Sequence, residues 1–504
     1  MRGKSIMLQG TASSVGKSLL TAALCRILHQ DGHRVAPFKS QNMALNSFIT
    51  RAGGEMGRAQ VMQAEACGVE PSVDMNPVLL KPTSDQGSQV VVDGRAIGNM
   101  KAMDYYAYKP QLKGVIQVAY DRLEARHDFV VIEGAGSPAE INLRDNDIVN
   151  MGMAEMADAP VLLIGDIDRG GVFASLAGTM MLLREEERRR VKGILINKFR
   201  GDVKLLEPGL KMLEDIVHVP VLGVIPWVQL DVDDEDSVTD RFRQRREGDI
   251  DIAVIRLKRI SNFTDFNALA LEQGVGLRYV SSVAELGNPD AVLLPGSKNT
   301  LEDLQALRRA GLDEAIVGYA NSGGMVFGVC GGYQMLGSML HDRYQSESNM
   351  GSVPGLGLLN MEVEFEREKI TSQVYARVES GPFGTQDVPL EGYEIHMGRN
   401  RIGCDASVFT RITRRAGQAL DEVDGILNAG GNVMGTYLHG VFDNPAFLRG
   451  FVNALRRRKG LPQLTGETVD YRQYKQAQYD RLADHVRANV DMGAIYRILR
   501  GAQG

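Results

Sequence analysis

The first half of the chain alternates short runs of apolar, mostly β-branched residues with stretches of helical periodicity. Continuous apolar runs of this kind are typical of strands buried on both faces of a parallel sheet. Between the first two runs, Leu20, Leu24 and Leu28 share one helical face, and Gly32 ends that pattern. The pattern predicts an open parallel sheet with crossover helices. Its strands are expected at 5–10, 34–39, 128–134, 159–168, 193–198 and 219–226.

A second series of buried strands begins after residue 250 and predicts a second open α/β sheet. The stretch before it is an acidic run followed by a basic run, a composition typical of a solvated linker. Near the end of the chain the pattern becomes helical and rich in arginine. The strands of the second sheet are expected at 251–257, 277–283, 291–297 and 323–330. The expected regions are a first domain at 1–230, a linker at 231–250, a second domain at 251–445 and a helical tail at 446–504.

Composition limits the class of protein. With 504 residues the chain is too long for one hydrophobic core, and its 44% apolar and 24% charged residues are ordinary for a globular protein. A dispersed net charge of -6 gives no reason to expect nucleic acid or a membrane surface as a partner. No C-x-x-C pair occurs, which argues against a disulfide scaffold or zinc finger. Because no apolar targeting segment is visible either, we expect a cytoplasmic protein. The cysteines are Cys25, Cys67, Cys330 and Cys404.

The first predicted strand leads into the loop GTASSVGKS, which resembles a phosphate-binding loop with one extra residue. Gly10 and Gly16 bound the loop, and backbone N–H groups at the following helix start would hold phosphate oxygens. Lys17 would neutralise the β- and γ-phosphates of ATP, and the Ser18 hydroxyl would ligate Mg²⁺. Glu133 ends the strand FVVIEG, where a carboxylate that organises Mg²⁺ is expected. Four further carboxylates are candidates for the same ion: Asp145, Asp147, Asp166 and Asp168.

The lengthened loop, of the form GT-x-x-x-x-GK[ST], resembles the loop of dethiobiotin synthetase and its relatives. In that family ATP phosphorylates a carboxylate or an amine before a C–N bond forms. The resemblance places Thr11 in the ATP site and Lys39, in PFKSQNMALN, near the transferred phosphate. Asn197 lies after a strand, where proteins with such loops often recognise the base, although a polar residue at a strand end is common. The lengthened loop thus favours a ligase over a switch GTPase.

The second half contains a candidate nucleophile. GVCGGYQMLG predicts a strand, a sharp turn at Cys330 and a helix, the arrangement that exposes a side chain at a helix N-terminus and lowers the pKa of a thiol. The other three cysteines are expected to be buried, small hydrophobic residues. A cysteine nucleophile needs a base, and the residues alone leave two histidines open. These are His439 in TYLHGVF and His396 in GYEIHMGR.

A resemblance to class I glutamine amidotransferases separates the two histidines. The pattern C-x-G-x-Q across Cys330, Gly332 and Gln334, followed far downstream by a strand-end histidine, is similar to that family. It implies that His439 is the catalytic base, that Gln334 contacts glutamine, and that the backbone near Gly296 contributes to the oxyanion hole. The family places a glutamate two residues after the histidine, but Val441 stands there. The residue that would orient the base is therefore not identified from the sequence.

Nine motifs occur in the order found in the cobyric acid synthase family, and together they cover nearly the whole chain. They are GTASSVGKS, PFKSQNMALNS, VIEGAGSPAEINL, GDIDRGG, NKFRGD, LPGSKNT, GVCGGYQMLG, GYEIHMGR and TYLHG. Enzymes of that family amidate the b, d, e and g side-chain carboxylates of adenosylcobyrinic acid a,c-diamide. The resemblance implies a corrinoid substrate, glutamine as the nitrogen donor, and ATP with Mg²⁺ as the activating system. It predicts neither the corrinoid-binding residues nor the oligomeric state.

Three alternatives have the same general plan. Cobyrinic acid a,c-diamide synthase is a sister enzyme, and KSQNMALNS and IDRGG favour the first family over it. CTP synthase also pairs an ATP domain with an amidotransferase, but it carries the glutamate that is replaced here by Val441. The third alternative is a P-loop ATPase scaffold with an inactive amidotransferase-like domain. The presence of both Cys330 and His439 argues against it.

Overall fold

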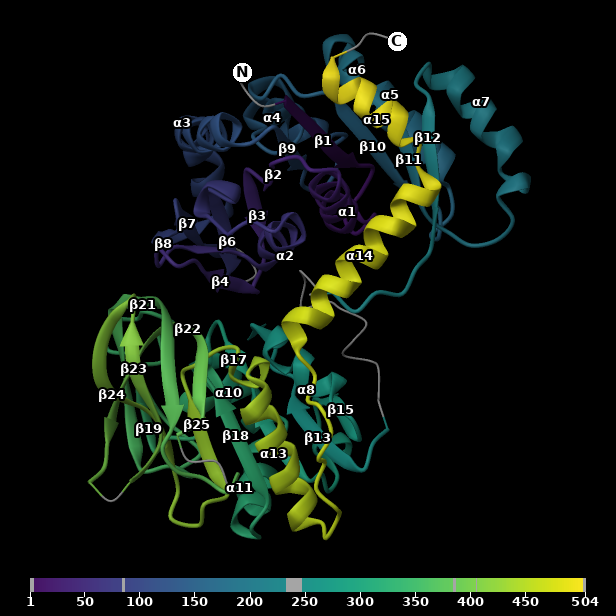
Figure 1. Cartoon of the computed structure of the whole chain (residues 1–504). Coiled ribbons are helices and arrows are strands. Elements are labelled where there is room, and N and C mark those ends of the chain that lie inside the picture. Colours follow the sequence, from purple (N-terminus) through teal and green to yellow (C-terminus); the bar gives the residue numbers. More distant parts are fainter. Residues whose placement is uncertain (1–3, 84–86, 233–246, 384–386, 405, 502–504) are drawn as a thin grey trace. The chain divides into compact units, whose positions relative to one another are not determined.

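The computed structural model describes residues 4–83, 87–232, 247–383, 387–404 and 406–501 (Figure 1). The chain forms two compact units. Residues 233–246, most of the expected linker, lie outside the described residues. The nucleotide-loop unit comprises Met1–Met43, Met56–Asp233 and Lys475–Gly504, and the Cys330 unit comprises Ala44–Glu55 and Asp234–Tyr474. The domain limits expected from the sequence stay a prediction. The structure adds that one segment from the first half of the chain packs with the second unit, and that the last segment of the chain packs with the first unit.

The nucleotide-loop unit is built on a six-stranded sheet in the order β12-β11-β10-β1-β9-β2 (Figure 1). All of its pairings are parallel, so the carboxyl ends of the strands share one edge. Each strand overlaps one of the six predicted from the apolar runs, and the predicted parallel sheet is therefore confirmed. The strands are β1 Lys4–Gly10, β2 Val35–Phe38, β9 Phe129–Glu133, β10 Val161–Asp166, β11 Val191–Phe199 and β12 Val221–Pro226.

Helices pack on this sheet because each presents an apolar face. In α1 (Lys17–Gln30), Leu20, Leu24 and Leu28 are buried in the core, as the helical spacing predicted. The same core includes side chains of the last two helices, α14 (Tyr471–Asn489) and α15 (Met492–Arg500), so α15 and the part of α14 from Lys475 onward belong to this unit. The remaining helices are α2 Arg58–Cys67, α3 Ala102–Arg126, α4 Met151–Met156, α5 Val172–Leu182, α6 Glu185–Arg190 and α7 Glu207–Val217.

A second, four-stranded sheet in this unit was not predicted. Its order is β3-β6-β7-β8, with β3 parallel to β6 and the other pairings antiparallel. Its strands mix polar and apolar residues, and the apolar runs in β6 and β7, 78–80 and 90–92, are only three residues long, which is too short for the pattern that revealed the main sheet. The strands are β3 Gln41–Met43, β6 Val78–Pro82, β7 Gly87–Val92 and β8 Arg95–Lys101.

The Cys330 unit contains an eleven-stranded sheet with a parallel and an antiparallel part (Figure 1). The parallel part has the order β15-β13-β16-β18-β25 and includes the predicted strands. The other part is mostly antiparallel: it has four long strands with polar residues on their exposed faces and two strands of three residues each, of which β19 pairs with β21 in parallel. The parallel strands are β13 Ile250–Ile255, β15 Val275–Val280, β16 Ala291–Leu294, β18 Met325–Val329 and β25 Val433–Thr436. The others are β19 Met339–His341, β20 Ser352–Pro354, β21 Met361–Val378, β22 Pro389–Ile402, β23 Ser407–Arg415 and β24 Gln418–Leu427.

The strand predicted at 291–297 is divided in the structure. β16 ends at Leu294, and Pro295, which has no N–H to donate, separates it from β17 (Gly296–Ser297). β17 leaves the large sheet and pairs antiparallel with β14 (Ile260–Ser261). The helices of this unit are α8 Asn267–Leu271, α9 Val283–Leu286, α10 Thr300–Arg309, α11 Leu312–Asn321, α12 Gly331–Met335 and α13 Pro445–Arg458.

A cluster of aromatic rings anchors the chain that follows β25. Phe442 lies three residues after His439, and its ring centroid is 5.4 Å from that of Phe327 in β18. Phe447 and Phe451 of α13 pack on the same ring, at 6.1 and 5.9 Å. Aromatic side chains bury large areas with little conformational freedom. The cluster therefore fixes the histidine-bearing loop against the strand that leads to Cys330.

Candidate active site

The nucleotide loop joins β1 to α1 and requires glycine at its end. Gly16 has φ 103°, and a Cβ there would lie 2.2 Å from the Asn197 amide nitrogen. That amide donates to the Val15 carbonyl at 2.8 Å, so Asn197 holds the loop backbone. At the other end, a Cβ on Gly10 would meet Val15 at 2.4 Å, and Thr11 N donates to the Ile164 carbonyl at 2.9 Å. The residues expected to bind ATP thus lie together at the carboxyl edge of the sheet.

Lys17, the first residue of α1, is buried beneath this loop. Its Nζ donates to the Ala12 and Gly136 carbonyl oxygens, each at 2.9 Å. These bonds hold the ammonium group between two backbone segments. If Lys17 binds phosphate as predicted, its charge is already in position before the phosphate arrives.

Glu133 is the centre of a buried polar cluster at the end of β9. One carboxylate oxygen, Oε1, accepts from Ser18 Oγ at 2.8 Å and from Lys39 Nζ at 2.9 Å. The other, Oε2, accepts from Gln63 Nε2 at 2.5 Å and, at 3.5 Å, from Gln60 Nε2. The structure therefore brings Ser18, Lys39 and Glu133 together, and their roles at an ATP and Mg²⁺ site stay a prediction. It adds two glutamines of α2 that no motif had indicated.

The arrangement of Ser18 and Glu133 fits a magnesium ion held mainly by phosphates and water. Mg²⁺ commonly uses one or two protein ligands in addition to phosphate oxygens, rather than a full protein cage. Consistently, the described part of the chain contains no group of three or more His, Cys, Asp or Glu residues that could hold a metal by themselves. The other candidate carboxylates have different partners. Asp166 pairs with Lys198 and Asp168 with Arg200, while Asp147 accepts from backbone N–H groups at the start of α4.

Cys330 lies at a strained turn between β18 and α12. Its φ of 51° and ψ of -110° are unusual for a residue with a side chain, and they turn the chain sharply from strand to helix. Glycines around it allow close backbone approach. A Cβ on Gly332 would lie 2.0 Å from the Leu294 oxygen, and one on Gly331 would lie 2.8 Å from Ser297 N. The start of α12 is thereby pressed against β17, next to the cysteine.

His439 faces this turn from the loop after β25. Its Nδ1 is 2.7 Å from Asp265 Oδ2, and both side chains are at most 3% exposed. Burial alone would lower the pKa of the imidazole, but Asp265 and Cys330 outweigh it and raise the pKa of His439 to about 10. Gly296 also approaches the ring, since a Cβ there would be 3.2 Å from His439 Cε1. Cys330, His439 and the β17 backbone therefore form one compact group.

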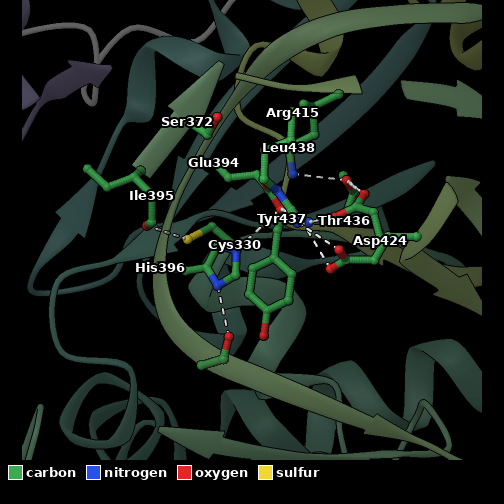
Figure 2. Close-up of polar contacts among 12 residues, drawn as sticks. Cys330, Ser372, Glu394, Ile395, His396, Arg415, Asp424, Thr436, Tyr437 and Leu438 are labelled. Atoms are coloured by element: carbon green, nitrogen blue, oxygen red, sulfur yellow. Dashed lines mark hydrogen bonds and ion pairs between the residues drawn. The ribbon is translucent and has the colours of Figure 1, made fainter. Parts of the chain in front are cut away.

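His396 and Tyr437 lie close to Cys330 (Figure 2). Gln334 Oε1 accepts from Thr300 Oγ1 at 3.1 Å, and its Nε2 is 3.4 Å from the Tyr437 hydroxyl. The His396 ring stacks on Tyr437 with centroids 3.7 Å apart, and its Nδ1 faces the Gly398 oxygen at 2.8 Å. The Cys330 thiol is 3.6 Å from the Ile395 carbonyl. His396 is thus close to the cysteine but stacked and hydrogen-bonded within the wall of the site.

Comparison with known proteins matches both halves of the chain. A family model described as the CobQ/CobB/MinD/ParA nucleotide binding domain matches residues 6–237, and one described as a CobB/CobQ-like glutamine amidotransferase domain matches residues 251–447. Proteins named cobyric acid synthase are similar over almost the whole chain. Those of Alkaliphilus metalliredigens and Yersinia enterocolitica are each 54% identical, over 98% and 99% of this chain and 100% and 98% of their own lengths. The chain belongs to the cobyric acid synthase family.

In this member of the cobyric acid synthase family, Asp265 is the acidic partner of His439, a residue that the sequence did not identify. It belongs to the segment Phe263–Phe266 and lies 174 residues before His439. Its second oxygen, Oδ1, accepts from Gly440 N at 3.0 Å, so the carboxylate is held against both the imidazole and the adjoining backbone. A single acidic residue within ISNFTDF carries no recognisable spacing relative to the histidine. Only the fold brings the two together.

Membership of the cobyric acid synthase family also explains why one chain contains both a nucleotide-binding domain and an amidotransferase domain. The nucleotide-binding match covers the loop with Lys17, and the amidotransferase match covers Cys330 and His439. Throughout the described ranges, every helix is too short or too polar to cross a membrane.

Proposed function

We propose that the chain uses ATP and glutamine to amidate the b, d, e and g carboxylates of adenosylcobyrinic acid a,c-diamide, giving adenosylcobyric acid. The observation that carries this proposal is the pairing, in a cobyric acid synthase family member, of a buried Cys330–His439–Asp265 group with a complete nucleotide loop. Neither an ATPase scaffold nor a free-standing glutaminase needs both the cysteine group and the nucleotide loop. The intact cysteine group also argues against the alternative of an inactive amidotransferase-like domain.

Glutamine hydrolysis is assigned to the Cys330 unit. The thiolate attacks the side-chain amide carbon, the C–N bond breaks, and His439 delivers the proton with which NH₃ leaves. Water then hydrolyses the γ-glutamyl thioester, with His439 accepting the proton, and glutamate and the thiolate are regenerated. The raised pKa of His439 supports its role as the proton donor, because an imidazolium beside Cys330 would stabilise a thiolate. Backbone N–H groups near Gly296 and at Gly331 are assigned to the oxyanion, and Gln334 to substrate binding.

Carboxylate activation is assigned to the nucleotide-loop unit. A corrinoid carboxylate oxygen attacks the γ-phosphorus of ATP, so that an acyl phosphate forms and ADP leaves. Ammonia then attacks the acyl carbon and releases inorganic phosphate. Lys17 and the loop N–H groups are assigned to the β- and γ-phosphates, and Lys39 is assigned to the transferred phosphate, which its contact with Glu133 supports. Ser18 and Glu133 would hold Mg²⁺, which neutralises phosphate charge when bound.

The Lys17→Ala variant tests the nucleotide half of this proposal. Amidation of adenosylcobyrinic acid a,c-diamide should fall by at least about 100-fold with either glutamine or ammonium, because charge stabilisation at the phosphates is worth several kcal/mol. Mass spectrometry of the corrinoid would count the amides, and the nucleotide products would be separated by chromatography. ADP and phosphate are expected. AMP with pyrophosphate, or an unchanged rate in the variant, would contradict the assignment.

The same assay separates the sister activity. Cobyrinic acid, which lacks the a and c amides, is supplied in parallel with the a,c-diamide. The proposal expects four amides to be added to the diamide. Efficient addition of two amides to cobyrinic acid, with none to the diamide, would instead identify a cobyrinic acid a,c-diamide synthase.

A further inference from the structure

The segment Ala44–Glu55 belongs to the Cys330 unit, although it comes from the N-terminal part of the chain. Thr371 Oγ1 of β21 donates to the Gly53 carbonyl at 2.9 Å, and Lys369 pairs with Glu55 at 2.6 Å. The Phe48 ring meets that of Tyr393 edge-on, with centroids 5.2 Å apart. These contacts attach the segment to β21 and β22. The amidotransferase family model, which matches 251–447, does not include it.

One carbonyl group of this segment is held by two buried side chains. The Ser47 oxygen accepts from Asn262 Nδ2 at 3.1 Å and from the Tyr393 hydroxyl at 3.2 Å. The same Asn262 amide donates to the Tyr393 hydroxyl at 2.8 Å, which closes a three-membered network. Ser47, Asn262 and Tyr393 are 1%, 2% and 5% exposed, so water cannot readily replace any member. Removing one member of such a buried network leaves each of the others with one hydrogen-bond partner fewer, which is energetically unfavourable.

Tyr393 connects the network to the catalytic histidine. Its ring stacks on that of His439, with centroids 5.2 Å apart and planes 20° apart. The two residues also exchange backbone hydrogen bonds, His439 N to Tyr393 O at 2.9 Å and Tyr393 N to His439 O at 3.3 Å. A Cβ on Gly392 would lie 2.2 Å from the His439 oxygen, which explains the glycine that opens GYEIHMGR. Tyr393 therefore fixes both the face and the backbone of His439.

Asn262 connects the same network to the carboxylate partner of the histidine. Its φ of 53° makes the turn from which Phe263–Phe266 begins, and its carbonyl accepts from Asp265 N at 3.0 Å. Asp265 in turn binds the histidine through Nδ1. The Ser47 carbonyl thus joins the two elements that set the position of the imidazole, one through its ring face and the other through its Nδ1.

We propose that the segment Ala44–Glu55 is part of the glutaminase site, where its Ser47 carbonyl, through Tyr393 and Asn262, positions His439. This inference rests on the proposed function. Tyr393 and Asn262 are positioning residues, since they act through His439 and Asp265. The proposal assigns a segment outside the amidotransferase match to the machinery of glutamine hydrolysis.

Two variants remove the network without removing the histidine. Tyr393→Phe deletes the hydroxyl but keeps the ring and the backbone bonds, and Asn262→Gly deletes the amide but tolerates the positive φ. Each should lower the kcat of glutamine-dependent amidation by roughly 10-fold, since small displacements of a catalytic group cost up to about 100-fold. The KM for glutamine and the ammonium-dependent rate should stay within about 2-fold of wild type. Thr371→Val is the matched control, because it releases the same segment at Gly53 and leaves Ser47 bound.

The pH dependence of Cys330 alkylation gives a second readout that a structural role would not change. Iodoacetamide labelling is followed by mass spectrometry. Cys404 is exposed, so the prediction that it is buried was wrong, and it serves as an internal reference. If the imidazolium is displaced, it stabilises the thiolate less, and the Cys330 profile of Tyr393→Phe should shift to higher pH. The Cys404 profile should not move.

Three results would overturn the inference: an unchanged kcat and alkylation profile in both network variants, an equal loss in Thr371→Val, or a parallel loss of ammonium-dependent activity. Failure of the wild-type enzyme to use glutamine at all would instead contradict the proposed function, so the two failures are distinguishable.

Discussion

At the residue scale, the proposed base of the glutaminase site, His439, is a buried imidazole that interacts with two other side chains. Asp265 contacts Nδ1, and Cys330 interacts with the same ring. Because the pKa of His439 is raised to about 10, the imidazole is protonated in the resting enzyme at neutral pH. The proposed site therefore rests with a positive charge beside Cys330, and this proton is available to the departing ammonia.

We expect Asp265→Asn to reduce glutamine-dependent kcat by about 10²- to 10⁴-fold, the range seen when the orienting carboxylate or the general base is lost elsewhere. The change keeps the size of the side chain, but it removes the charge that stabilises the imidazolium. Ammonium-dependent amidation is the control and should remain near wild type. Measuring both rates on one preparation decides the point. A glutamine-dependent rate within 3-fold of wild type would remove Asp265 from the mechanism.

The raised pKa of His439 also predicts a pH profile. A raised pKa of His439 favours the charged imidazole at all pH values below about 10, so the imidazolium should persist beside Cys330 through neutral pH. Because a neighbouring positive charge promotes the reaction of a thiol, alkylation of Cys330 at neutral pH should be slower in Asp265→Asn than in the wild type. The contribution of charged His439 to the free energy of unfolding is fully present below the ordinary histidine pKa and is lost as pH rises towards 10. Identical alkylation profiles in the two proteins would contradict this electrostatic account.

Sequence reasoning at this scale reached residues with a recognisable local pattern and missed those without one. Cys330 stands between glycines at a strand–helix turn, and Gly16-Lys17-Ser18 follows a strand, so both could be found. Asp265 and Gln63 have no such spacing. Their partners, His439 and Glu133, are 174 and 70 positions away, and the contacts exist only after the sheets have formed.

At the scale of elements, close packing of backbones fixes the position of the nucleophile. β16 and α12 approach so closely that Gly332 has no room for a side chain. The sequence revealed the parallel strands because they are continuously apolar, but it gave no sign of the long antiparallel strands β21 to β24, whose outer faces are polar. Nor did it separate β17 from β16, although Pro295 marks the division in retrospect.

We expect Gly332→Ala to destabilise the Cys330 unit by at least about 3 kcal/mol, because the new Cβ would meet the Leu294 carbonyl oxygen, which is backbone and cannot rotate away. The matched control is Gly318→Ala in α11, where a Cβ has open space and helix propensity adds about 0.5–1 kcal/mol. Thermal unfolding of the two variants gives the comparison. Equal melting temperatures would show that the turn is not tightly packed.

At the scale of the whole molecule, the two units share one chain by exchanging segments. Ala44–Glu55 packs with the Cys330 unit, and Lys475–Gly504 packs with the nucleotide-loop unit. In the latter, Arg26 pairs with Asp480 at 2.8 Å and Lys475 with Glu65 at 2.7 Å. The apolar pattern predicted both sheets and their order along the chain. It could not predict these exchanges, because a short segment or an amphipathic helix fits either unit by pattern alone.

The central claim is that the Cys330 unit supplies ammonia to a carboxylate activated in the other unit, and the nitrogen source tests it most directly. Cys330→Ala is assayed for amide formation on adenosylcobyrinic acid a,c-diamide with ATP and either glutamine or an ammonium salt. The account predicts that glutamine-dependent amidation is lost, while the ammonium-dependent rate stays close to wild type. His439→Ala should behave similarly but keep more activity, since a thiol at a helix start retains some thiolate. A glutamine-dependent rate that survives in Cys330→Ala would contradict the account.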